Sequence, residues 1–209
     1  MIFYDCSTAP SPRRARILLS EKNVPHETIN IDLMSGEQLG EEFRKINPGC
    51  TVPALKLNDG TVLTQNAGIA AYLESEYPEI LMLGRTSAEK GQVASWTAKI
   101  EFEAMMAIAE ALRNSVPALQ NRALPGSENY AQIPDLVERG MARINVFLDS
   151  FNAHLEGREF VATDEFSNAD ITAAVAIDFA RIIRVEPQEH HGNIVRWRAG
   201  LSERPSMSL

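Results

Sequence analysis

Short apolar runs and amphipathic segments alternate over the first part of the chain. The apolar runs predict strands, and the segments between them carry apolar positions at helical spacing. The predicted elements are a strand at 2–4, a helix at 12–21, a strand at 26–33, a polar helix at 37–46 and a helix at 67–77. In the first helix we expect Ser11 to be the N-cap and Pro12 the first helical residue, because these positions favour these residue types.

A hairpin is predicted before the last of these helices. Residues 52–57 and 61–63 flank Asn58-Asp59-Gly60, a sequence that favours a tight turn between antiparallel strands. The order is therefore strand, helix, strand, helix, strand, strand, helix. Alternation of strand and helix predicts a parallel crossover, and the hairpin adds an antiparallel edge. We expect an α/β domain over residues 1–78.

The pattern changes after residue 78. Pro78 and Gly84 interrupt the chain there, and we interpret residues 79–87 as a linker. Residues 88–209 are predicted to form an all-helical domain. Its predicted elements are a long helix at 88–114, a loop at 119–127, an amphipathic helix with apolar positions from Val137 to Leu155, and a final helix around 194–197.

The clearest helix start lies at Ser167. Ser167 is a predicted N-cap with Asp170 three residues later, and the flanking Phe166 and Ile171 can form a hydrophobic staple. Residues 171–177 are apolar on nearly every side, which is typical of a helix buried at the centre of a helical domain. We therefore assign Ser167 and Asp170 to folding and not to catalysis.

Composition and charge limit the classes of function. The 209 residues include 20 Lys and Arg and 28 Asp and Glu, which gives a net charge of −8. The acidic balance disfavours general binding to nucleic acid and to anionic membrane surfaces. No apolar run approaches the roughly 20 residues of a membrane-spanning helix, and the first residues lack the basic segment of a signal peptide. We expect a cytoplasmic protein with no nucleic-acid or membrane partner.

The cysteines and histidines suggest neither redox nor metal chemistry. Cys6 and Cys50 are too far apart for a Cys-x-x-Cys pair, and we expect two buried, inert thiols. His190-His191 has no third ligand at a recognisable spacing, so we expect no metal site.

Four short sequences, in this order and at these separations, resemble the cytosolic glutathione transferases. They are Ser11-Pro12 with Arg16-Ile17, Asn47-Pro48 followed by Val52-Pro53, Gln65-Asn66, and Phe166-Ser167-Asn168-Ala169-Asp170. Thr8-Ala9-Pro10 and Pro12-Arg13-Arg14 are most similar to the bacterial and fungal branch. The resemblance implies a thioredoxin-like, glutathione-binding domain followed by an all-helical domain, usually in a homodimer, and a role in detoxification.

The implied chemistry needs the thiolate of glutathione. A free thiol has a pKa of about 8.5 and is mostly protonated at neutral pH. A hydroxyl hydrogen bond and a helix N-terminus both favour the anion. The resemblance gives the catalytic role to Ser11, whose hydroxyl would hold the glutathione sulfur. The alternative is that Ser11 only caps the helix, and Tyr4, Cys6, Ser7 and Thr8 are other nearby candidates.

The remaining glutathione contacts are also implied by the resemblance. Pro53 is expected to be cis, so that the backbone N–H and C=O of Val52 pair with the cysteinyl unit like a short extra strand. Gln65 and Asn66 are expected to hold the γ-glutamyl end, where the N–H groups of a helix start suit a carboxylate. The alternatives are that Pro53 starts an edge strand, and that Gln65 and Asn66 only end a strand and cap a helix.

Three positions depart from the family pattern, all within the expected glutathione site. The family commonly has Ser or Thr where this chain has Asn66, and often has Gly and then Gln or Lys where it has Cys50 and Thr51. Ser35 stands where close relatives often carry Lys. Lost cations weaken carboxylate binding, so these departures concern affinity for glutathione more than fold.

Two hypotheses for the function follow. The first is a glutathione transferase that activates the thiol for attack on a small electrophilic or apolar substrate, with glutathione as co-substrate and no metal. The second is a related protein without transferase activity that binds a ligand or regulates a partner. Met105, Met106 and Ile108 are candidates to line the electrophile pocket, although such a stripe also suits a core or a dimer interface.

Overall fold

The computed structural model describes residues 1–209, and the chain divides into two compact units. The first comprises residues 1–81, 125–129 and 209, and the second comprises residues 82–124 and 130–208. No helix in the chain has both the length and the apolar character that spanning a membrane requires.

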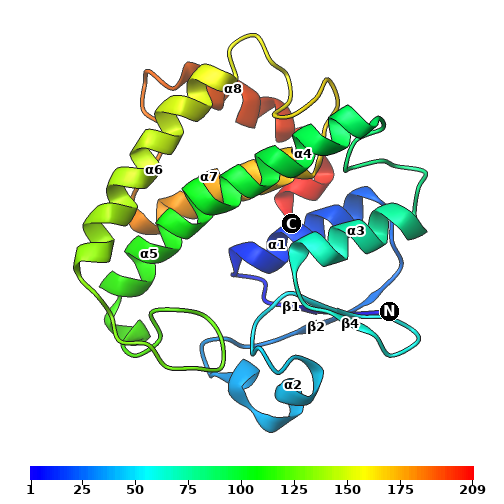
Figure 1. Ribbon diagram of the computed structural model, residues 1–209, viewed down its shortest axis with the longest axis vertical. Helices are drawn as coiled ribbons and strands as arrows, with labels where there is room; N and C mark the ends of the chain where they lie inside the picture. The colour runs from blue at the N-terminus through cyan, green and yellow to red at the C-terminus, as the bar shows by residue number, and fades with distance from the viewer. The chain divides into compact units, whose positions relative to one another are not determined.

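The first unit is built around a mixed four-stranded sheet in the order β2-β1-β3-β4 (Figure 1). β1 pairs with β2 in parallel and with β3 antiparallel, and β3 pairs with β4 antiparallel. The predicted element order, crossover and hairpin are therefore confirmed. The elements are β1 (Ile2–Asp5), α1 (Pro10–Glu21), β2 (Glu27–Asn30), η1 (Glu37–Leu39), α2 (Glu41–Ile46), β3 (Ala54–Lys56), β4 (Val62–Leu63) and α3 (Asn66–Glu76).

The two faces of the sheet pack against different helices. Tyr4 and Ala54 form a core with Ile31 and with Phe43 of α2. Strand residues alternate between faces, so the fully buried Phe3 points to the opposite side, where α1 and α3 lie next to each other (Figure 1). The alternation read from the sequence between residues 26 and 33 fits this arrangement, because Ile29, Ile31 and Leu33 belong to the α2 side.

A buried ion pair joins the two neighbouring helices. The ammonium of Lys22, at the end of α1, lies 2.9 Å from a carboxylate oxygen of Glu74 on α3, and its side chain is 0% exposed. Lys22 also donates to the carbonyl of Ile80. Because both charges are withdrawn from water, the pair fixes α1 against α3 and the segment that follows it.

One predicted helix of the first unit is divided in two. The polar segment 37–46 contains the short 3₁₀ turn η1 and the helix α2, separated by Gly40 in an extended conformation with ψ 158°. The Glu37 carboxylate accepts from the backbone N–H of Asp32, which anchors the first turn to the preceding loop. The segment is therefore helical in two pieces and not continuous.

The second unit is all helical (Figure 1). Its elements are α4 (Ser87–Ile100), the π-helical turn η2 (Glu101–Met105), α5 (Met106–Ser115), η3 (Pro117–Leu119), α6 (Asp135–His154), α7 (Asn168–Ala180), η4 (Arg181–Ile183), α8 (Gly192–Leu201) and η5 (Pro205–Ser208). The long helix predicted over 88–114 corresponds to α4, η2 and α5, which follow one another without a break. The observed helix differs from the predicted one in the wider, π-helical turn at η2.

Helices α5 and α6 approach closely at Gly140. A Cβ added to Gly140 would lie 2.5 Å from the carbonyl oxygen of Ala107 and 2.8 Å from the backbone nitrogen of Ala111. Only a residue without a side chain allows this backbone contact. The glycine in the middle of α6 is therefore required by packing, despite its low helix propensity.

Helix α7 is the buried centre of this unit, as its sequence predicts. Ser167 is its N-cap, and both the backbone N–H and the hydroxyl of Ser167 donate to Asp170 at 3.0 Å. The other carboxylate oxygen of Asp170 accepts from the N–H of Val161 and from the indole of Trp197. Asp170 thus joins three segments of the unit, which confirms the folding role of this capping motif.

Candidate functional site

The start of α1 differs from the prediction, and the difference concerns Ser11. The helix begins at Pro10, with Ala9 as an N-cap that makes no side-chain capping bond. Proline lacks the N–H that the first helical position leaves unpaired, so Pro10 can begin the helix as well as Pro12 can. Ser11 is thus the second residue of α1 and not its N-cap. Its half-exposed hydroxyl has no hydrogen-bond partner in the chain and is free to meet a ligand.

The loop before α1 carries the other hydroxyl and thiol candidates. Tyr4 is packed in the core edge-on to Phe43, with ring centroids 5.9 Å apart. Cys6 is also buried, and its sulfur lies 3.5 Å from the hydroxyl of the exposed Thr8. Ser7 is exposed. Of these four candidates, Tyr4 and Cys6 are therefore buried, and only Ser7 and Thr8 are exposed to a ligand from solvent.

An ion pair holds the beginning of this loop. The Arg16 guanidinium makes two hydrogen bonds to the Asp5 carboxylate, at 2.8 and 2.9 Å, and a third to the carbonyl of Cys6 at 3.2 Å. Asp5 in turn accepts from the N–H of Cys6 at 2.7 Å. The Cys6 peptide is thus fixed from both sides. The sequence indicates Arg16 only as part of the motif with Ser11-Pro12. The structure adds that its guanidinium binds Asp5 at the end of β1.

The Val52-Pro53 peptide bond is cis, as expected. The Val52 N–H and C=O have no hydrogen-bond partner within the chain, so both are available to an extended ligand. The preceding turn is held by the side chain of Asn47. Its Nδ2 donates to the carbonyl of Thr51 at 2.7 Å, and its Oδ1 accepts from the backbone N–H of Gly49. Cys50 is buried, with a φ of 54°.

Gln65 and Asn66 occupy different positions at the start of α3. Gln65 is the N-cap, makes no side-chain capping bond and is exposed. Asn66 is the first helical residue and not a cap, and its Nδ2 donates to the carbonyl of Ser11 at 3.1 Å. The structure therefore brings together the starts of α1 and α3. The first helical bond of α3 runs from Ile69 to Gln65, which leaves the N–H groups of residues 66–68 without intrahelical partners.

Ser35, the third position that departs from the family pattern, lies in a turn that begins at Asp32. Its hydroxyl donates to the carbonyl of Asp32, and its N–H donates to the Asp32 carboxylate. Hydrogen bonds from the backbone of Ser35 and Met34 lower the pKa of Asp32. Ser35 therefore stabilises its own turn.

The three residues proposed for an electrophile pocket are not equivalent. Ile108 and Met105 are 0% and 8% exposed, whereas Met106 is 44% exposed. The first two belong to the core of the helical unit. The stripe read from the sequence is therefore mainly packing, and only Met106 presents its side chain to the surface.

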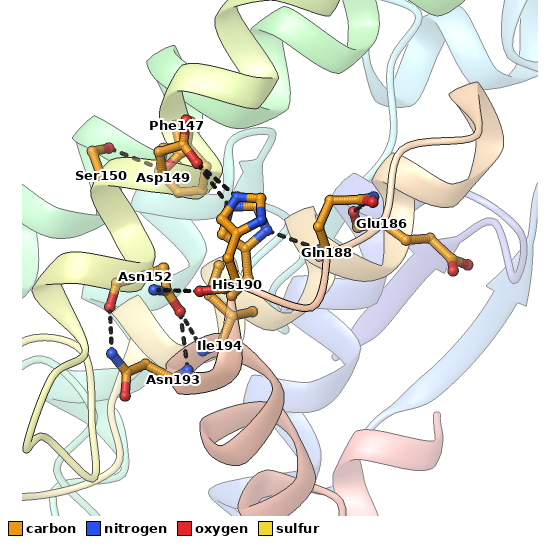
Figure 2. Close-up of polar contacts among 10 residues, drawn as sticks. Phe147, Asp149, Ser150, Asn152, Glu186, Gln188, His190, Asn193 and Ile194 are labelled. Carbon is orange, nitrogen blue, oxygen red and sulfur yellow. Dashed lines mark hydrogen bonds and ion pairs between the residues drawn. The ribbon is translucent and has the colours of Figure 1, made fainter.

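A third polar group joins His190 and His191, although the sequence indicated none (Figure 2). It is Asp149 of α6, whose Oδ1 lies 3.3 Å from Nε2 of His190 and 2.9 Å from Nε2 of His191. These hydrogen bonds lower the pKa of Asp149. No local spacing reveals this group, because Asp149 lies 42 residues from His191.

The hydrogen bonds assign this cluster to folding. Nδ1 of His191 accepts from the backbone N–H of Gln188 at 2.9 Å, so Nε2 carries the proton and donates to Asp149 (Figure 2). A metal-binding histidine has the opposite arrangement, in which the second ring nitrogen donates to an acceptor. Asn152, also on α6, binds the start of α8 through the N–H groups of Asn193 and Ile194. Together these residues fasten the turn before α8 to α6.

Comparisons with known proteins show the family to which the chain belongs. The sequence profile of the glutathione S-transferase N-terminal domain matches residues 8–76, and that of the C-terminal domain matches residues 103–205. Glutathione S-transferase 2 of Saccharomyces cerevisiae is 31% identical over 99% of this chain and 88% of its own length.

Two further matches differ in extent. A glutathione S-transferase domain-containing protein of Marinobacter aquaeolei has a crystal structure with a TM-score of 0.90, at 31% identity, covering 99% of this chain and all of that one. Protein URE2 of Debaryomyces hansenii is 37% identical over 95 residues, which are 43% of this chain and 31% of that protein. With a full-length relative above 30% identity and both domains matched, the chain belongs to the glutathione S-transferase family.

Proposed function

We propose that this protein is a glutathione transferase in which Ser11 activates the glutathione thiol for attack on a small electrophile. The observation that carries the proposal is the half-exposed, unpaired Ser11 hydroxyl in the first turn of α1. The competing interpretation, in which Ser11 caps the helix, lacks support because Ala9 is the N-cap. A hydroxyl donor and a helix N-terminus together stabilise a thiolate relative to the thiol.

The backbone around the cis bond and the start of α3 would hold the rest of glutathione. The unpaired N–H and C=O of Val52, before Pro53, suit the cysteinyl unit. The unpaired N–H groups at the start of α3, including that of Asn66, suit the γ-glutamyl carboxylate, and the exposed Gln65 amide suits its polar groups. Glutathione is thus a co-substrate, and the chemistry requires no metal.

The wider assignments follow from the same proposal. We divide the chain into a glutathione-binding domain at 1–78, a linker at 79–87 and a helical domain at 88–209. We further propose a cytoplasmic homodimer that detoxifies small electrophiles.

The alternative is a non-catalytic ligand-binding or regulatory protein. The partial similarity to Protein URE2 favours it, as do the uncharged Thr51 and Ser35 at positions where relatives often have longer side chains. A calorimetric titration separates the two functions at the first step. Binding of reduced glutathione, and no binding of cysteinylglycine, which lacks the γ-glutamyl unit, supports the proposed site. No binding at several millimolar glutathione contradicts it.

The catalytic role is tested by Ser11→Ala. Turnover of an electrophilic substrate should fall about 10- to 100-fold, the scale of one hydrogen bond to a charged group, whereas glutathione affinity should change little. Ser20→Ala is a matched control, because Ser20 is an exposed serine on the same helix. Unchanged turnover in Ser11→Ala would transfer the activation to the helix terminus or to another hydroxyl.

A further inference from the structure

The first two residues of the loop between β1 and α1, Cys6 and Ser7, are anchored by hydrogen bonds to neighbouring elements. Arg16 and Asp5 hold the Cys6 peptide, and the N–H of Ser7 donates to the Asn30 side chain at the end of β2, at 3.0 Å. These contacts fix the entry to α1. They come from α1 itself and from the strands next to it.

The contact from Asn66 is different because it comes from α3. Its Nδ2 reaches the carbonyl of Ser11 at 3.1 Å, across 55 residues of sequence, and the bond is partly buried. That carbonyl lies in the first helical turn, next to the unpaired hydroxyl of the same residue. The Asn66 side chain is thus bonded to the protein, whereas its backbone N–H, at the first position of α3, is not.

We propose that Asn66 is a positioning residue for thiol activation. Its amide fixes the first turn of α1, and with it the direction of the Ser11 hydroxyl, from the helix that would hold the γ-glutamyl end. The inference rests on the proposed function and changes the role of Asn66 within it. The side chain acts through Ser11, and only the backbone N–H of Asn66 meets the ligand.

The two roles of Asn66 predict different kinetics. A side chain that binds glutathione directly affects its dissociation constant. A side chain that positions Ser11 affects kcat and the apparent pKa of the bound thiol, which is followed by the ultraviolet absorbance of the thiolate as pH rises. Removing the donor should loosen the Ser11 hydroxyl and leave more of the bound thiol protonated.

The experiment compares Asn66→Ala and Asn66→Asp with a matched control. Asn145→Ala removes a similar amide-to-carbonyl bond, from Asn145 to Met141 at 2.8 Å, on the exposed side of α6. We expect Asn66→Ala to lower kcat about 3- to 10-fold, the scale of one neutral hydrogen bond. It should also raise the apparent pKa of the bound thiol, keep the dissociation constant of glutathione within about twofold, and match Asn145→Ala in thermal midpoint. Asn66→Asp replaces the donor with an acceptor and should also lower kcat, with a larger rise in the thiol pKa from its negative charge. The same charge lies beside the donors proposed for the γ-glutamyl carboxylate and should raise the dissociation constant of glutathione, so only Asn66→Ala tests that constant.

Two results would overturn the inference. One is a raised dissociation constant with unchanged kcat and thiol pKa, which assigns the side chain to direct binding. The other is wild-type behaviour in all three measurements. The proposed function fails separately, through absence of glutathione binding to the wild-type protein or through unchanged turnover in Ser11→Ala measured in the same series.

Discussion

At the scale of single residues, Asp170 combines deep burial with several hydrogen bonds. Its carboxylate accepts from Val161, Ser167 and Trp197, at 2.9 to 3.1 Å. These donors favour the charged form, but burial outweighs them and raises the pKa of Asp170 from 3.8 to about 6. The folded protein therefore holds this proton more tightly than the unfolded chain does.

The raised pKa predicts a pH dependence of stability. The contribution of this carboxyl is fully present below the unfolded pKa of 3.8 and is lost as pH rises through about 6. The loss is of the order of 3 kcal/mol in the free energy of unfolding. Urea unfolding of the wild type and of Asp170→Asn, which cannot titrate at this site, measures it. The advantage of the wild type should be larger at about pH 4 than at about pH 8.

A control at an exposed carboxyl isolates the effect of burial. Asp164→Asn makes the same substitution in the loop before α7, where the side chain is exposed. It should leave the pH dependence close to that of the wild type. A wild-type advantage over Asp170→Asn that stays constant or grows with rising pH would contradict a raised pKa at Asp170.

Which residues were predictable depended on how far apart their partners lie in the sequence. Asp170 and Ser167 form a local motif, so their pairing was predicted. Asp149 meets His191 across 42 residues, and Asn66 meets Ser11 across 55. No local spacing encodes such contacts, because they depend on how whole elements pack. The sequence therefore named candidate site residues, but it could not indicate which atoms of Asn66 are already bonded.

At the scale of elements, the close contact of α5 and α6 gives a prediction at Gly140. Alanine normally stabilises a helix interior relative to glycine by about 1 kcal/mol. At Gly140 the added Cβ would lie 2.5 Å from a backbone oxygen of Ala107, so the helices must separate. We expect Gly140→Ala to destabilise the protein by about 1–3 kcal/mol, the usual effect of overpacking, as measured by urea unfolding.

The same substitution in an open position should have the opposite sign. Gly91 lies inside α4, and a Cβ added there would meet nothing within 4 Å. Gly91→Ala should therefore stabilise the protein by about 0.5–1 kcal/mol. If both variants shifted stability in the same direction, the contact between α5 and α6 would not be what requires glycine at Gly140.

The elements were predicted better than their ends. The order of elements along the chain, the hairpin and the long helices follow from periodicity and turn residues, which are properties of short windows of sequence. The start of α1 was wrong by two residues because Pro10 and Pro12 both suit a first helical position. The break at Gly40 and the π-helical turn at Glu101–Met105 were missed because helical spacing hardly changes across them.

At the scale of the whole molecule, glutathione should stabilise the folded protein. A ligand that binds only the folded state adds about 2.7 kcal/mol at a concentration of 100 times its dissociation constant. In a chain of this size, that corresponds to a rise of about 5–10 °C in the midpoint of thermal unfolding, if unfolding is cooperative. The protein carries a net charge of −8 and glutathione is an anion, so binding depends on local donors and not on overall attraction.

The location of this stabilisation separates a specific site from general binding. Amide hydrogen exchange should slow at the starts of α1 and α3 and around Val52, where unpaired backbone groups would meet the ligand. The exposed face of α6 has no such groups and should change least. Cysteinylglycine at the same concentration should raise the midpoint much less, because it cannot reach the start of α3. Equal shifts with both peptides, or protection spread evenly over the two units, would show that the γ-glutamyl end is not recognised where the structure leaves donors for it.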